Sequence, residues 1–134
     1  MQRFKNTDIV EMPDDGKARH QGDVLLLPID ALPNGCVEMP RDELGRVVLA
    51  LGETTGHAHT FHEPHVKHYH LLANTNDKFV RQFVVIEGKP AVLRHETTGF
   101  QPADHGFQRY APRIYEVPPQ VEWTDDDEPI EVKD

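Results

Sequence analysis

Short apolar runs separated by turn residues cover most of this chain, and no stretch keeps a helical period. Glycine, proline, asparagine and aspartate mark the gaps between the runs, a spacing that is typical of all-β sandwiches and barrels. The runs with strand character lie at residues 24–29, 36–39, 46–51, 65–72, 78–87, 91–96, 113–117 and 120–123. The sequence therefore predicts an all-β, single-domain fold, a small barrel or sandwich of about seven or eight short strands.

The strand pattern occupies the middle of the chain, whose 134 residues suit one domain. Residues 1–19 are polar and predict an arm, ordered only if it docks on the domain or on a partner. Residues 20–123 form the predicted β domain, and residues 124–134 form an acidic, solvated tail. The core is expected to contain Val24, Leu26, Val48, Leu49, Val84, Ile86 and Val92.

Charge and cysteine content narrow the classes of function. The formal net charge of −9 disfavours contact with phosphate backbones, so nucleic acid is an unlikely partner. Cys36 is the only cysteine, which is compatible with a reducing compartment. The first residues lack the apolar core of a signal peptide, and no apolar run approaches membrane-spanning length. We expect a cytoplasmic protein without a membrane contact, and homo-oligomerisation stays open.

Histidines concentrate in residues 52–70, which hold six of the nine and follow directly on a predicted core strand. His57 and His59 are two residues apart, so on an extended backbone their imidazoles face the same side and can share one cation. Imidazole is the commonest protein metal ligand. The pair therefore indicates a divalent transition metal such as zinc, iron, manganese, nickel or copper, and the ligand type does not choose among them.

A third ligand has to come from another part of the chain. His95 ends a different predicted strand, and His105 lies in the long loop predicted at residues 97–112. Because strand ends in a small barrel lie near one another, we expect at least three of these imidazoles to converge on one ion. Glu53 and Glu96 are candidate proton carriers beside a bound water. The four residues expected to hold the metal are His57, His59, His95 and His105.

The remaining histidines of the stretch are less constrained. His65 and His68 are expected to face solvent, since histidine-rich strands also occur on surfaces without a metal. Whether His62, His65, His68 or His70 takes part in the site stays open.

Gly52, the His57-Ala58-His59 pair and Glu63 resemble the first motif of the cupins. Cupins are small β-barrels that hold a metal through such a pair, a following glutamate and a later histidine. The glycine here is one residue closer than in that pattern, and the glycine expected after the glutamate is missing. The resemblance covers about twenty residues and implies a metal held by these side chains.

A wider resemblance covers most of the chain from Gln21. Its pattern is QGDVL at residues 21–25, GExTGHAH at residues 52–59 and HE at residues 95–96, followed by His105, Tyr115, Gln120 and Glu122. In this pattern the chain is similar to a group of small uncharacterised bacterial and phage proteins. That group has no assigned activity, so the resemblance implies domain limits and the shape of a site, and it supplies no reaction.

These residues favour a histidine-based, metal-binding β-domain, either a metal-dependent hydrolase or a cupin-like enzyme that acts on a small-molecule substrate. Three protein ligands and an open position would activate water or polarise a substrate oxygen. The alternative is a non-enzymatic phage or bacterial accessory or assembly protein that acts through protein–protein contacts. A third hypothesis, an RNA-handling enzyme with metal-free histidines as acid and base, is disfavoured by the negative charge.

Overall fold

The computed structural model confirms the all-β class. It describes residues 9–51, 56–72, 81–119, 121–123 and 129–131, without the side chains of residues 104, 105 and 121–131. No helix occurs among these residues, so none of them belongs to a helix long and apolar enough to cross a membrane.

The first of two main sheets has five strands in the order β1-β10-β9-β6-β5. Its strands are β1 (Ile9–Glu11), β10 (Pro102–Tyr110), β9 (Ala91–Glu96), β6 (Ala58–Phe61) and β5 (Val47–Leu51). Neighbouring strands are antiparallel except for β1, which pairs in parallel with β10.

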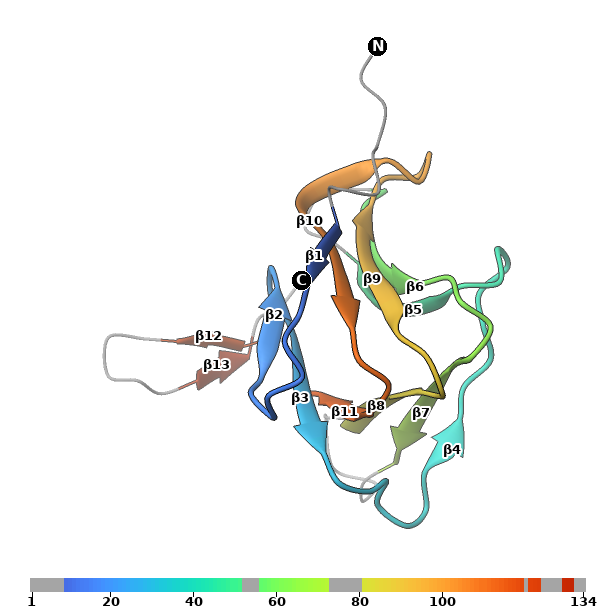
Figure 1. Ribbon diagram of the computed structural model, residues 1–134, viewed down its shortest axis with the longest axis vertical. Coiled ribbons are helices and arrows are strands. Elements are labelled where there is room, and N and C mark those ends of the chain that lie inside the picture. The colour runs from blue at the N-terminus through green and yellow to red at the C-terminus, as the bar shows by residue number, and fades with distance from the viewer. Residues whose placement is uncertain (1–8, 52–55, 73–80, 120, 124–128, 132–134) are drawn as a thin grey trace.

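The second sheet has six antiparallel strands in the order β2-β3-β11-β8-β7-β4. Its strands are β2 (Arg19–Gln21), β3 (Val24–Ile29), β11 (Ile114–Val117), β8 (Arg81–Ile86), β7 (Val66–Leu71) and β4 (Val37–Glu38). A separate hairpin joins β12 (Val121–Trp123) to β13 (Pro129–Glu131) and extends to the left in Figure 1.

The two main sheets face one another in a sandwich-like arrangement and remain open (Figure 1). Apolar side chains from both sheets form one buried core, with Leu26 and Val84 on one side and Phe61 and Leu93 on the other. Six of the seven predicted core residues are buried. The exception is Val48, because the inward positions of β5 are taken by its neighbours Val47 and Leu49.

Several strands lie outside the runs that the sequence predicted, namely β1, β2, β6, β10 and β13. The prediction of a loop at residues 97–112 is wrong, because β10 occupies most of it and buries Phe107 and Tyr110. Its pairing with β9 shifts register between Pro102 and Phe107, so the two-residue alternation that identifies a strand is interrupted there. The first residues of the run predicted at 78–87 lie outside the described residues.

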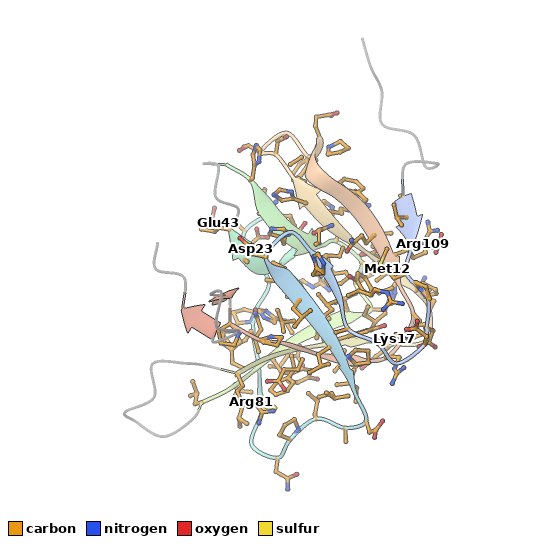
Figure 2. The ribbon with its side chains drawn as sticks, turned by 90° about the vertical axis from the view of Figure 1, so that its left-hand side faces the viewer. Met12, Lys17, Asp23, Glu43, Arg81 and Arg109 are labelled. Carbon is orange, nitrogen blue, oxygen red and sulfur yellow. The ribbon has the colours of Figure 1, made fainter. Side chains whose placement is uncertain are left out.

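The N-terminal segment docks on the first sheet. Ile9 and Glu11 pair with Phe107 and Arg109 of β10, and Glu11 also forms an ion pair with Arg109. The backbone N–H of Met12 donates to the carbonyl of Arg109 at 2.8 Å, and the Met12 side chain packs against the core. Figure 2 shows the side chains of Met12 and Arg109 near one another beside β1. Residues 9–12 of the N-terminal arm therefore dock on the domain through β10.

Candidate histidine site

Three imidazoles gather at one end of the first sheet. His59 of β6 lies directly opposite His95 of β9, and their rings are stacked with centroids 4.3 Å apart and planes 7° from parallel. The ring of His57, just before β6, meets the ring of His95 edge-on at a centroid distance of 5.7 Å. We call His57, His59 and His95 the imidazole cluster. The side chain of His105, the fourth predicted ligand, lies outside the description.

The imidazole cluster faces the interior of the sandwich because of strand alternation. His59 lies two residues before Phe61, and His95 lies two residues after Leu93. Both of those apolar residues belong to the core, so the histidines point to the same inner face. His59 and His95 are only 3% and 6% exposed. The cluster therefore lies in low-dielectric surroundings, where the partners of each ring nitrogen matter.

Gln21 fixes the orientation of His59. The amide nitrogen of Gln21 donates to the carbonyls of Leu93 at 2.9 Å and of Gly106 at 2.8 Å. Its oxygen therefore faces Nδ1 of His59, 2.8 Å away, and accepts a hydrogen bond from it. In the neutral ring the lone pair is then on Nε2. Gln21 is fully buried, and no local pattern in the sequence identifies this role, because all three contacts are tertiary.

The observed ring arrangement is not that of a formed metal site. Within the described residues, no group of three or more histidine, cysteine, aspartate or glutamate side chains has the spacing to hold a metal ion. An imidazole lone pair lies in the plane of its ring. The lone pairs of two stacked, nearly parallel rings 4.3 Å apart therefore lie in separate planes, whereas bonds of about 2.0–2.1 Å to one ion require the lone pairs to converge.

Glu96 lies on the opposite face of the sheet from the imidazole cluster, because it is adjacent to His95 in β9. Its carboxylate is completely buried. One oxygen, Oε1, accepts hydrogen bonds from Arg46 at 3.0 Å, Thr60 at 2.6 Å and His62 at 2.7 Å. We call Glu96 and these three donors the Glu96 cluster. This placement directs the carboxylate away from the three imidazoles.

The Glu96 cluster extends through Arg46 to a second carboxylate, Asp42, and the other oxygen of Glu96, Oε2, is buried without a hydrogen-bond partner among the described residues. Burial opposes the charge on Arg46, but its hydrogen bonds to Asp42 and Glu96 outweigh burial and raise the pKa of the guanidinium. Burial likewise opposes the Asp42 carboxylate, and hydrogen bonds from Arg46 lower the pKa of Asp42 overall. The ring of Phe100 covers the cluster, 5.6 Å from the His62 ring and 5.7 Å from the Arg46 guanidinium carbon. Phe100 has a φ of 62°, which is rare for a residue with a side chain.

The other acidic candidates lie elsewhere. Glu63, which the cupin resemblance pairs with the histidines, accepts a hydrogen bond from the backbone N–H of Val92 at 2.8 Å, toward the start of β9. The described residues therefore do not assemble a cupin-like ligand set. Glu53 lies outside the described residues.

The expectation that His68 faces solvent is wrong. Val66 and His68 share the inner face of β7, and His68 is 7% exposed. Its Nε2 donates to the side-chain oxygen of Gln82 at 2.6 Å. Burial lowers the pKa of His68, and the neighbouring His70 lowers it further. His65 is half-buried, with Nε2 3.1 Å from the carbonyl of Pro90.

Fold and site together define a small β-sandwich with a buried histidine cluster at one end. Residues 20–120 match a family described as Domain of unknown function (DUF8820), and the chain belongs to this family. The match includes the whole imidazole cluster and begins after β1. Neither curated proteins nor solved structures gave a match to the chain.

Proposed function

We propose that the domain binds a divalent transition metal, such as zinc, iron, manganese or nickel, at the imidazole cluster. His57, His59 and His95 are the proposed ligands, and His105 is the candidate for a further position. The observation that supports this proposal is the contact between Gln21 and His59. Histidines that bind metals usually donate their second ring N–H to a fixed acceptor, and the buried amide oxygen of Gln21 is such an acceptor.

Binding requires a change of side-chain rotamer within the imidazole cluster. Gln21 orients His59, and the planes of the His59 and His95 rings have to leave their parallel arrangement for both lone pairs to reach one ion. His57 precedes β6 and is half-buried, which leaves its ring room to follow. Rotation of an imidazole about its side-chain torsions is a small cost beside the free energy of metal binding, about 10–16 kcal/mol for structural zinc in zinc-finger peptides.

A hydrolytic reaction is the finer part of the proposal. A metal with three protein ligands and an open position activates water or polarises a substrate oxygen. Within this chain His59 is the held ligand and Gln21 its support. Glu96 faces the other side of the sheet, so Glu53 is the better candidate of the two for moving a proton.

Metal analysis of protein purified without a histidine tag tests the proposal. We expect about one equivalent of bound metal after incubation with zinc or manganese, and a loss of binding in His59→Ala and in His95→Ala. His65→Ala is the matched control, because this histidine lies outside the cluster, and it should bind as the wild type does. Less than about a tenth of an equivalent, with no gain on adding metal, would sink the proposal.

A non-enzymatic accessory or assembly role is the alternative, and one observation favours it. β4 and β5 are edge strands of the two sheets, and each carries an exposed apolar side chain, Val37 at 52% and Leu51 at 75%. Edges of this kind are suited to pairing with another chain. Sedimentation of wild type and of Val37→Lys with Leu51→Lys tests this role, since the substitutions should abolish any self-association.

A further inference from the structure

The N-terminal arm passes from one sheet to the other. β1 pairs with β10 at the edge of the first sheet, and β2 pairs with β3 at the edge of the second sheet (Figure 1). Residues 12–18 join these two strands, and residues 13–18 are all exposed. β1 is therefore a short strand that is attached to the domain through an exposed tether.

A small set of contacts holds the arm, and all of them are with the core or with residues 107–113. β1 pairs with three residues of β10, and Met12 packs against the core. Glu11 forms an ion pair with Arg109, and Asp14 forms one with Arg113 at 3.0 Å. Ion pairs between exposed side chains add little to stability, so neither of them fixes the arm firmly. A second arm of the same sequence would find the same contacts at this edge.

The return of the arm onto its own domain depends on a bend at Gly16. The φ angle of Gly16 is 78°, a left-handed conformation that residues with a side chain rarely adopt. Asp15 supports the bend, because its carboxylate accepts a hydrogen bond from the backbone N–H of Lys17 at 3.0 Å and pairs with Arg19 at 2.6 Å. With an extended Gly16, the arm would point away from its own domain and toward a neighbouring molecule.

We propose that the edge of β10 also binds the arm of a second copy of this chain, and that two copies exchange their arms reciprocally. Exchange opens only the bend at Gly16. It keeps the strand pairing, the Met12 contact and both ion pairs, because these join the arm to residues 107–113 and the core. Such an exchange is a low-cost route to a dimer, and its two-fold symmetry stops it there.

Charge complementarity supports a second copy as the occupant of this edge. The chain carries a formal net charge of −9, so two copies repel one another except where a basic site of one meets an acidic segment of the other. Arg109 and Arg113 form a basic site at the edge, and Glu11 and Asp14 lie in the acidic segment that fits it. The inference does not depend on the proposed metal site.

Exchange becomes measurable when docking within one molecule is weakened and docking between molecules stays available. A short tether gives the arm an effective concentration in the millimolar range, so the closed monomer predominates in the wild type at micromolar concentrations. Reversal of charges on either the arm or the edge removes this advantage. All four charged side chains are at least partly exposed, so the reversals should leave the fold intact.

The experiment uses two full-length chains. An arm-reversed chain carries Glu11→Arg with Asp14→Arg, and an edge-reversed chain carries Arg109→Glu with Arg113→Asp. Each chain alone opposes like charges, whereas an exchanged pair of the two restores every ion pair. Native mass spectrometry of the mixture should show a 1:1 heterodimer at least about tenfold more abundant than either homodimer. A mixture that stays monomeric, or that forms the three dimers in equal measure, would overturn the inference.

Two controls separate arm exchange from other association. A chain with all four substitutions restores both ion pairs within one molecule and should stay monomeric. Val37→Lys with Leu51→Lys in both chains removes association through the edges of β4 and β5, and the heterodimer should persist. The arm-reversed and edge-reversed chains both keep a net negative charge, so overall attraction cannot draw them together. Loss of the heterodimer in the lysine background would contradict the assigned edge.

A change of the hinge tests the same inference without any change of charge. Apart from its chain neighbours, a Cβ at Gly16 would meet no heavy atom within 4 Å, so Gly16→Val strains the bend through its backbone alone. The dimer association constant should rise at least about tenfold by analytical ultracentrifugation. Gly45→Val is the matched control, because Gly45 has the same φ of 78° and the same open space in a turn away from the arm. A monomeric Gly16→Val variant, or equal dimerisation of the two variants, would contradict arm exchange.

Discussion

His95 and Glu96 are consecutive residues of one strand, and they belong to two clusters of opposite character. On the inner face, the rings of His59 and His95 are stacked, and Gln21 accepts a hydrogen bond from His59. On the outer face, Glu96 is locked by an arginine, a threonine and a histidine under an aromatic cover. The difference shows that strand alternation places a histidine and a glutamate that are adjacent in sequence in two separate side-chain clusters on opposite faces of one sheet.

The largest effect on stability is expected at the Glu96 cluster. Arg46→Met leaves the buried Glu96 carboxylate without its ionic partner and should lower the free energy of unfolding by about 3–5 kcal/mol. Urea denaturation measures this loss. Adding Glu96→Gln removes the buried charge and should restore a substantial part of it. A loss below about 1 kcal/mol in Arg46→Met would show that the two clusters do not differ in their contribution to the free energy of unfolding.

The next effect tests the inner cluster. Gln21→Met leaves two buried carbonyls and the N–H of His59 without partners, which should cost about 1–3 kcal/mol by urea denaturation. Metal affinity should fall about 10–100-fold in the same variant, as is usual when the support of a ligand is lost. An equal fall in affinity for Arg46→Met, measured below its melting temperature, would erase the distinction between the clusters.

A smaller effect is expected from pH at His68, on the inner face of the second sheet. Burial holds the pKa of His68 below its ordinary value of 6.5, so below pH 6.5 the unfolded chain binds more protons than the folded one. The contribution of the neutral His68 to the free energy of unfolding is therefore intact above pH 6.5. It is lost as the pH falls, by about 1.4 kcal/mol for each unit of difference between the folded and unfolded pKa. Thermal melts from pH 7 to pH 5 should show a shallower decline for His68→Gln than for wild type.

The smallest effect is expected at the cover of the Glu96 cluster. Phe100→Gly relieves a left-handed backbone conformation, which favours the variant by about 1 kcal/mol, and removes the ring contacts with His62 and Arg46, which cost a similar amount. The melting temperature should therefore change little. Phe100→Val keeps the strained backbone and loses the ring, so this matched variant should be clearly less stable than Phe100→Gly.

The sequence predicted those parts of the site that depend on strand alternation alone. His57 and His59 are two residues apart, His95 ends a neighbouring strand, and these features suffice to bring the three rings together. The same rule assigns Glu96 to the other face, so its placement was available from its position beside His95. The all-β class followed from the spacing of apolar runs and turns for the same reason.

The parts that the sequence did not predict depend on tertiary contacts or on broken alternation. Gln21 acts through two carbonyls and a histidine that lie far away in the chain. β10 contains a register shift, so its apolar residues do not alternate. His68 has a polar side chain and is nevertheless buried, because its hydrogen-bond partner Gln82 comes from the next strand. None of these features leaves a periodic signal.

The parallel pairing of β1 with β10 has a consequence for handling the protein. β10 has nine residues, and β1 covers the outer edge of Phe107, Gln108 and Arg109. A chain shortened to residues 20–120, the limits of the family match, would present these unpaired backbone groups to solvent. Such an edge is a template for pairing with other molecules, so the shortened chain should fold and yet be prone to aggregate. By covering this edge, β1 should protect the protein from aggregation, so a chain made for expression should begin before Ile9.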